Sequence, residues 1–527
     1  MFLLTYFSHP LFEFSALAAH FYASVSLPLL GGLVLSFGLE GLLKPFAPAL
    51  RRPWRSLCVH ISLWTLLFCI FLALTQRPWF STVLTIAIHL LIVLVSNAKY
   101  RALREPFVFA DFEFFSDSLK HPRLFLPYFG IWRVVAGCVF FNTSLYLGLT
   151  LEPGIPKTSG WGIFLVGLAT MVAAAIVLLC AATPRQHPSR FDPAADIRAH
   201  GLLPTLWSYA LAARTMHDLP GNFPYIAATG SRKSQALPNI VIVQSESFFD
   251  ARRLHPEVHP ALLQHFDSIR AASAQYGHLH VPAWGGNTAR SEFSFLTGLR
   301  REALGVHRFN PHRTLSPRGI PSIASYLKGL GYRTVCIHPY PVQFYSRHEA
   351  YPSLGFDRFI DIELFHDAKR YGPYISDQAV SEKICALLGE SDVPTLVFAI
   401  TMENHGPLHL ERVAAGDHER LYSSRPPQGY DDLTIYLRHL QNADLMIRDL
   451  RQHLAQSKTE SCLCWYGDHV PILSSIYDTK AFGDGRTDYF IWKKGLDSAA
   501  ANFKDIEIAD LGITLLEHAG LRPVHSN

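Results

Sequence analysis

The first 182 residues contain five long apolar windows, and these windows most constrain what the chain can fold into. They lie at residues 18–40, 56–75, 79–98, 131–151 and 161–182. A helix needs about 20 predominantly apolar residues to cross a bilayer, and each window is about that long. One such window could be a buried helix of a soluble protein. Five in succession, with Trp and Tyr near several of their ends, predict a helical transmembrane domain over residues 1–183.

The chain between the third and fourth windows is too polar to cross a membrane and too aromatic to be a free linker. We therefore expect a segment near 99–125 to lie on the membrane surface. The composition changes after this domain. Residues 184–237 form a polar connector with an amphipathic stretch at 202–212, and residues 238–522 have the mixed composition of a globular domain. The N-terminus lacks a basic region and a small-residue cleavage site, so we expect the first window to remain as an anchor.

The globular part alternates short apolar, β-branched runs with helical segments. The runs lie at 239–243, 333–337, 395–401 and 462–466, and the helical segments at 261–274, 321–330, 376–389 and 431–455. Continuous apolar runs of this length are typical of buried strands in a parallel sheet. The alternation predicts an α/β domain with a mostly parallel sheet flanked by helices.

Each of the four runs is followed closely by side chains that bind metals or phosphate. Glu246 follows the first run, His338 the second and His405 the third, and Asp468 and His469 follow the fourth. Ligands of open α/β sheets bind beyond the carboxyl ends of the strands. We therefore expect these side chains to meet at one edge of the sheet.

Thr288 lies after a Gly-Gly-Asn turn and before apolar residues at helical spacing, Phe293, Leu296 and Leu299. This pattern places Thr288 at or just before a helix N-terminus. Free backbone N–H groups and the helix dipole favour a phosphate or a developing alkoxide there. A simple threonine N-cap is the commoner explanation of such a residue. The side chains at the strand ends favour the interpretation of Thr288 as a nucleophile.

Glu246, Asp468 and His469 provide two carboxylates and one imidazole, and the Thr288 oxygen adds a fourth ligand. Such a mainly oxygen set suits Mn²⁺ or Mg²⁺, with Zn²⁺ as an alternative. A threonine hydroxyl is a weak nucleophile at neutral pH, and coordination to a metal lowers its pKa. For Asp468 and His469 alone, an exposed pair on a turn is the simpler explanation. Together with Glu246 and Thr288 they predict metal-dependent phosphotransfer through a phospho-threonine.

Other polar residues could bind the group that is transferred. His338 and His405 can donate to phosphate or to a leaving-group oxygen. Tyr345 and Arg347 follow His338 by seven and nine residues, and an arginine fork beside an aromatic wall suits a phosphodiester. A structural histidine and a surface arginine are the commoner explanations for such residues.

Four motifs resemble the lipoteichoic acid synthase and phosphoglycerol transferase family, which belongs to the alkaline phosphatase and sulfatase superfamily. They are Gln-Ser-Glu-Ser, Gly-Asn-Thr-Ala-Arg-Ser-Glu-Phe, Glu-Asn-His-Gly-Pro and Tyr-Gly-Asp-His. The resemblance covers essentially the whole chain, because that family also has about five spans before an extracytoplasmic catalytic domain. It implies a nucleophile (Thr288), metal ligands (Glu246, Asp468, His469) and head-group contacts (His338, Tyr345, Arg347, His405). Tyr345 stands where Gram-positive synthases have Trp.

The resemblance implies a multi-pass enzyme of the bacterial inner membrane with a periplasmic catalytic domain. It would move glycerol phosphate from phosphatidylglycerol to a periplasmic or cell-surface glycan and release diacylglycerol. The arginine-rich composition is compatible with a Gram-negative source. A net charge of +4 without a basic, aromatic-rich run argues against a nucleic-acid partner.

Two alternatives remain open at this stage. Phosphoethanolamine transferases share the Glu, Thr, Asp and His set, but they usually carry several disulfides. The eight cysteines here are scattered without metal spacing, which favours small buried residues and the phosphoglycerol branch. A non-catalytic membrane sensor that binds lipid or glycan is the other alternative. Such a binder would not need the nucleophile.

The basic residues conflict with the expected topology. They cluster after the first window (Lys44, Arg51, Arg52, Arg55) and after the third (Lys99, Arg101, Arg104, Lys120, Arg123). The positive-inside rule favours the cytoplasm for both loops, and with five spans the globular domain lies on that same side. The resemblance favours the opposite orientation. We expect the second arrangement, in which the basic surface segment faces anionic lipid head groups.

Overall fold

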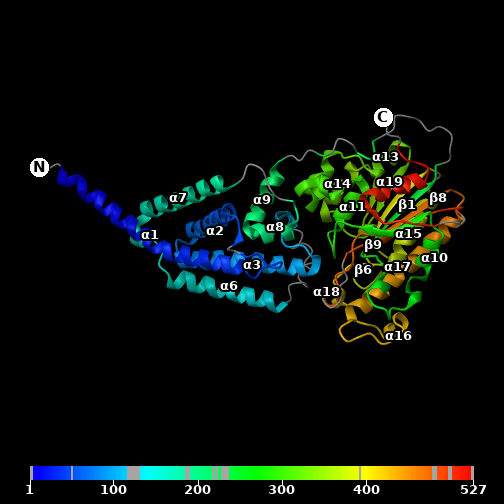
Figure 1. The fold of residues 1–527 in the computed structure, drawn as a ribbon, viewed down its shortest axis with the longest axis horizontal. Helices are drawn as coiled ribbons and strands as arrows, with labels where there is room; N and C mark the ends of the chain where they lie inside the picture. Colours follow the sequence, from blue (N-terminus) through cyan, green and yellow to red (C-terminus); the bar gives the residue numbers. More distant parts are fainter. Residues whose placement is uncertain are drawn as a thin grey trace. The chain divides into compact units, whose positions relative to one another are not determined.

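The computed structural model describes residues 4–48, 51–114, 131–183, 190–215, 219, 223–226, 237–390, 393–477, 484–496 and 501–523. The chain divides into two compact units, Met1–Thr215 and Met216–Asn527. The first unit is helical, and the second is built around a sheet with helices on its faces (Figure 1). The division falls inside the segment that the sequence predicts as a connector.

Apolar helices make up the first unit. They are α1 (Leu4–Glu40), α2 (Trp54–Thr75), α3 (Pro78–Leu103), α6 (Ile131–Leu151), α7 (Pro156–Ala182), α8 (Pro193–His200) and α9 (Leu202–Arg214). Four stretches are long and apolar enough to cross a membrane: Ser15–Glu40, Trp54–Thr75, Pro78–Leu103 and Pro156–Ala182. A shorter apolar stretch, Val135–Leu151, lies in α6. The predicted helical membrane domain is thus confirmed, with four of the five windows meeting the length criterion among the described residues.

The end of α6 is fixed to the start of α3. Both carboxylate oxygens of Glu152 accept backbone N–H groups of α3, from Trp79 and Phe80, at 2.9 Å each. The backbone N–H of Ile155 donates to the Gln76 carbonyl at 2.9 Å. The α2–α3 and α6–α7 connections therefore lie at the same end of the helical bundle.

The predicted surface segment contains the short 3-10 helix η2 (Phe109–Phe114). Lys99 Nζ lies 2.7 Å from carboxylate oxygens of both Glu105 and Asp111. Arg52 is buried and paired with Glu40. Lys99, which the sequence suggested for lipid contact, and Arg52, a basic residue of the loop after the first window, are thus neutralised by carboxylates of their own unit. Lys120 and Arg123 lie outside the described residues.

Five parallel strands form the centre of the sheet in the second unit. Their spatial order is β8 (Ser461–Gly467), β1 (Asn239–Ser245), β7 (Thr395–Ile400), β3 (Arg333–Ile337) and β4 (Arg358–Ile360). Beyond β8 lie β9 (Thr487–Lys493), antiparallel to its neighbours, then β2 (Gln275–His280), with β10 (Asn502–Phe503) and β11 (Ile506–Glu507) at the edge. A separate hairpin pairs β5 (Arg370–Tyr371) with β6 (Tyr374–Ile375).

Helices cover both faces of this sheet. One face packs α10 (Gln264–Ala271), α15 (Asp377–Gly389) and α17 (Asp431–Gln456). The other packs α11 (Thr288–Thr297), α13 (Ile323–Gly329), α14 (Arg347–Ser353) and α19 (Ile508–His518). The remaining short helices are α12 (Pro311–Thr314), α16 (Asp417–Leu421) and α18 (Ser474–Tyr477).

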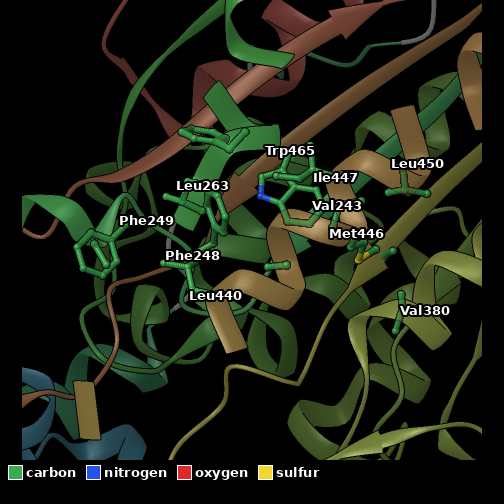
Figure 2. Packing of buried hydrophobic residues seen from close by; sticks show 14 of the residues in the cluster. Val243, Phe248, Phe249, Leu263, Val380, Leu440, Met446, Ile447, Leu450 and Trp465 are labelled. Atoms are coloured by element: carbon green, nitrogen blue, oxygen red, sulfur yellow. The ribbon is translucent and has the colours of Figure 1, made fainter. Parts of the chain in front are cut away.

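Strand residues alternate between the two cores, because successive side chains of a strand point to opposite faces. Val241 and Val243 belong to the first core, and Ile240 and Ile242 to the second. Figure 2 shows part of the first core, where Val243 and Trp465 lie near Met446 and Ile447 of α17. Both cores hold the parallel strands in place, so the strand ends that carry the site rest on a rigid base.

The predicted α/β class with a mostly parallel sheet is confirmed. The four predicted strands coincide with β1, β3, β7 and β8 to within two residues at each end. The sequence analysis missed β2 and β9, which make the sheet mixed. All eight cysteines are free, although Cys138 and Cys180 are exposed on the helices of the first unit and are not buried as expected.

Candidate active site

Three chain segments bring the predicted metal ligands together. Glu246 follows β1, Asp468 and His469 follow the neighbouring parallel strand β8, and Thr288 begins α11. Gly467 allows the close approach of the first two segments, because a Cβ there would lie 1.8 Å from the Phe248 carbonyl oxygen.

His469 directs one ring nitrogen toward the other predicted ligands. Its Nδ1 lies 3.0 Å from the Val470 carbonyl oxygen. A carbonyl oxygen only accepts hydrogen bonds, so Nδ1 carries the proton in this contact. Its Nε2 lies 3.3 Å from Thr288 Oγ1, 3.3 Å from Asp468 Oδ2 and 3.4 Å from Glu246 Oε1. Ligand atoms of Glu246, Asp468 and His469 all lie within 4.8 Å of one another. The structure thus brings all four predicted residues to one point.

The donor set fits a divalent cation. Asp468 Oδ2 is buried and has no hydrogen-bond partner within the described part of the chain. Burial, followed by the nearby Glu246 carboxylate, raises the pKa of the Asp468 carboxyl to about 7. Burial lowers the pKa of His469, but these two carboxylates outweigh it and the pKa is raised overall. Two carboxylates facing an imidazole lone pair in a buried site repel one another unless a proton or a cation lies between them.

Neighbouring groups fix the ligands in this arrangement. Backbone N–H groups of Ser247 and His469 donate to Asp468 Oδ1 at 2.9 and 3.0 Å, which leaves Oδ2 toward the centre. The Ser247 hydroxyl donates to Glu246 Oε1 at 2.8 Å. Supporting contacts of this kind orient metal ligands. The sequence analysis did not identify Ser247, since a serine beside a strand end has many simpler explanations.

The N-terminus of α11 places Thr288. Asn287 precedes it in the left-handed region, with φ of 64°, and Gly285 N donates to the Val470 carbonyl at 3.1 Å. The turn before the helix is thereby fixed to the loop that carries His469. Ser291 Oγ, one turn along the helix, donates to the Asp468 backbone carbonyl at 2.7 Å. Thr288 itself is buried, with 7% of its surface exposed.

The predicted head-group residues His338 and Arg347 contact each other. Arg347 Nη1 donates to His338 Nε2 at 3.2 Å, and His338 Nδ1 donates to the Ile400 carbonyl at 3.2 Å. Burial, followed by Arg347, lowers the pKa of His338 to about 3. His338 is therefore neutral, and both of its ring nitrogens bind protein groups. In this arrangement it supports Arg347 and has no N–H left to donate to phosphate.

Tyr345 lies over Arg347, whose guanidinium carbon is 5.2 Å from the ring centroid. Tyr345 and Ser346 both adopt the left-handed region, with φ of 57° and 55°. Non-glycine residues in this conformation are strained and cluster at ligand-binding sites. His405 is half-buried, and its Nδ1 lies 2.6 Å from the Gly406 carbonyl and 3.3 Å from the Tyr374 hydroxyl.

Comparison with known proteins places these residues in a family. The sulfatase family model matches residues 238–521, more than half of the chain. The chain is 29% identical over 495 residues to the capsular polysaccharide biosynthesis protein RkpI of Rhizobium meliloti (strain 1021), with 86% of each protein covered. It is 28% identical over 272 residues to a putative cyclic beta-1,2-glucan modification protein of the same organism, covering 52% of this chain and 42% of that protein.

A solved membrane protein shares the two-part fold. The integral membrane lipooligosaccharide phosphoethanolamine transferase A of Neisseria meningitidis aligns with a TM-score of 0.52 at 12% identity. The alignment covers 88% of this chain and 95% of that protein, so it includes the helical unit. The similarity confirms a fold with apolar helices before an alkaline phosphatase and sulfatase type domain.

Proposed function

The chain belongs to the sulfatase family, and we propose that it transfers phosphoglycerol from phosphatidylglycerol to a glycan. In the first step Thr288 Oγ1 forms a bond to phosphorus, and the bond from phosphorus to the diacylglycerol oxygen breaks. Diacylglycerol leaves with a proton on that oxygen. In the second step a glycan hydroxyl oxygen forms the new bond to phosphorus, the bond from phosphorus to Thr288 Oγ1 breaks, and the proton of the glycan hydroxyl returns to Thr288 Oγ1.

The observation that carries this proposal is the convergence of three ligand groups on the hydroxyl of a helix-terminal threonine. Glu246, Asp468 and His469 would hold a divalent cation, which supplies a Lewis acid that lowers the pKa of the Thr288 hydroxyl. The N-terminus of α11, at Thr288, would favour the phosphoryl oxygens through its helix dipole. Arg347 and His405 would contact the head group, with Tyr345 as a wall and His338 as the support of Arg347.

The donor and the acceptor follow from two different features. The spans of the first unit would hold the enzyme beside its lipid donor. The acceptor is inferred from the relatives, which are named for capsular polysaccharide biosynthesis and for modification of a cyclic glucan. A glycan hydroxyl is therefore the acceptor that we propose. Mn²⁺ or Mg²⁺ is the proposed metal because most of the ligand atoms are oxygens.

We also propose that the second unit faces the outer side of the bacterial inner membrane, where a glycan acceptor is available. Removal of the eight cysteines would allow single cysteines to report the topology. Gln428→Cys probes the second unit, and Lys157→Cys probes the α6–α7 connection; both positions are exposed. A membrane-impermeant maleimide should label only Gln428→Cys in intact spheroplasts. The opposite pattern contradicts this orientation.

Turnover with defined lipids tests the reaction. The purified protein is mixed with vesicles of phosphatidylglycerol or phosphatidylethanolamine and a cyclic glucan, and diacylglycerol and modified glucan are measured by mass spectrometry. We expect diacylglycerol from phosphatidylglycerol only, and none with Thr288→Ala. Release from phosphatidylethanolamine alone would assign the protein to phosphoethanolamine transfer. Binding of lipid without turnover under all metal conditions would favour a non-catalytic sensor.

A further inference from the structure

A second buried polar cluster lies one helical turn after the nucleophile. Its centre is Glu292, which lies four residues after Thr288 on α11 and is fully buried. Its oxygens accept from Arg347 Nε at 3.1 Å and Nη2 at 2.5 Å, from the Tyr351 hydroxyl at 2.5 Å and from His312 Nε2 at 3.1 Å. Four donors thus bind one carboxylate.

The charge pair at the centre of this cluster stays ionised. Burial raises the pKa of Glu292, but Arg347 and His312 outweigh it and hold the pKa well below its usual range. The Arg347 guanidinium binds the carboxylate through two parallel N–H groups, a geometry that fixes both its position and its plane. An arginine side chain that is not held in this way loses rotamer entropy when it binds a ligand. Here the protein has already imposed that order.

The remaining hydrogen-bond capacity of Arg347 is directed away from Glu292. Of its five N–H groups, two bind Glu292 and one binds His338 Nε2, so two have no partner among the residues that the structure describes. The Tyr345 ring covers the guanidinium. Residues four apart on a helix lie on the same face, with Cβ atoms about 5–6 Å apart. Glu292 therefore fixes Arg347 relative to the turn of α11 that carries Thr288.

We propose that Glu292 is a positioning residue for head-group recognition, which holds Arg347 so that its two remaining N–H groups meet oxygens of the phosphoglycerol group. His338 also holds Arg347 in place, because its Nε2 accepts a hydrogen bond from Arg347 Nη1. Thr288 and the residue that positions Arg347 thereby lie on the same helix, α11. This inference rests on the proposed function, because it takes a phosphoglycerol group as the ligand of Arg347.

A double-mutant cycle of Glu292→Gln and Arg347→Lys, made in the full-length protein, tests the proposal. Each single change should raise KM for phosphatidylglycerol by about tenfold to a hundredfold, the range for losing a hydrogen bond to a charged group. The kcat should fall much less. The double variant should be little worse than either single variant, because both residues act through one guanidinium.

Asp444→Asn serves as the matched structural control. Asp444 is also a buried carboxylate, and it accepts only backbone N–H groups, from His265 and Phe266. Its loss should lower the melting temperature without changing KM, and combined with Arg347→Lys it should be additive. If Glu292→Gln behaves like Asp444→Asn, with additive losses and an unchanged KM, Glu292 is only structural and the proposal is wrong.

A binding measurement separates this proposal from the proposed reaction. In a Thr288→Ala background, calorimetry with glycerol phosphate reads affinity without turnover, and Glu292→Gln should weaken the Kd at least tenfold. Glu292→Asp and Tyr351→Phe are milder changes to use if Glu292→Gln does not fold, and each should also weaken the Kd. Unchanged affinity in all folded variants overturns the inference. Absence of turnover by the unchanged protein, with this loss of affinity intact, overturns only the reaction.

Discussion

Two buried polar clusters lie one turn apart on α11. They differ in how many of their polar atoms are hydrogen-bonded within the described part of the protein. Around Thr288, no described residue donates a hydrogen bond to Asp468 Oδ2, and His469 Nε2 faces two carboxylates. Around Glu292, four donors bind one carboxylate. We propose that a cation from outside balances the charges of the first cluster, whereas the carboxylate of the second is bound by donors of the chain itself. The difference agrees with our proposal that the first cluster performs the chemistry and the second orients Arg347.

The largest effect is expected at Thr288. Thr288→Ala should reduce diacylglycerol release by about three orders of magnitude or more, because the nucleophile is removed. Thr288→Ser should retain part of the activity, since the hydroxyl remains. Thr297→Ser is the control, because Thr297 lies at the other end of the same buried helix and donates only to the Phe293 carbonyl. Near-normal turnover by Thr288→Ala would contradict a covalent intermediate.

Another buried cluster, formed by His439, Glu403 and Glu411, should lose its ion pairs as pH rises. Burial lowers the pKa of His439, but hydrogen bonds to Glu403 and Glu411 outweigh it and raise the pKa from 6.5 to about 9. The protonated imidazole therefore stabilises the fold fully below pH 6.5, and this contribution is lost as pH rises through about 9. It amounts to roughly 3 kcal/mol.

Hydrogen exchange of α17 between pH 6.5 and 9.5 measures this loss, with rates corrected for the intrinsic effect of pH. His439→Gln should remove most of the pH dependence. A wild-type α17 that is equally protected at both pH values would show that His439 does not carry the charge.

The smallest effect is expected where a neighbouring group only supports a ligand. Ser247→Ala removes the hydroxyl that donates to Glu246 Oε1. Loss of such supporting contacts typically weakens metal affinity by about tenfold to a hundredfold. Added metal should then restore the activity of Ser247→Ala, whereas it should not restore the activity of Thr288→Ala. Titration of Mn²⁺ into both variants distinguishes the two outcomes, and a Ser247→Ala enzyme that stays inactive at saturating metal contradicts a supporting role.

The sequence predicted the parts of the fold and site that depend on local patterns. The strands β1, β3, β7 and β8 are continuous apolar runs, and the polar residues after them lie where parallel strands end. The strand β2 is polar and half-buried along one side, so its pattern carries little signal. The antiparallel direction of β9 depends on pairing between distant segments, which no local pattern encodes.

Glu292 shows the same limit within the site. A glutamate inside a helix usually indicates an exposed face, and its partner Arg347 lies 55 residues away in sequence. Only the tertiary structure shows that the two side chains bind each other in the core. The convergence of Glu246, Asp468 and His469 could be predicted because they follow the ends of two parallel strands, β1 and β8, but the partner that orients Arg347 could not.

Metal occupancy measured together with activity tests the central claim most directly. The protein is stripped with a chelator, Mn²⁺ is added back in steps, and bound metal and diacylglycerol release are determined at each step. We predict one ion per chain, activity that rises in proportion to occupancy, loss of both in Asp468→Asn and retention of metal binding in Glu292→Gln. Full activity in excess chelator, with no metal bound, would contradict the account.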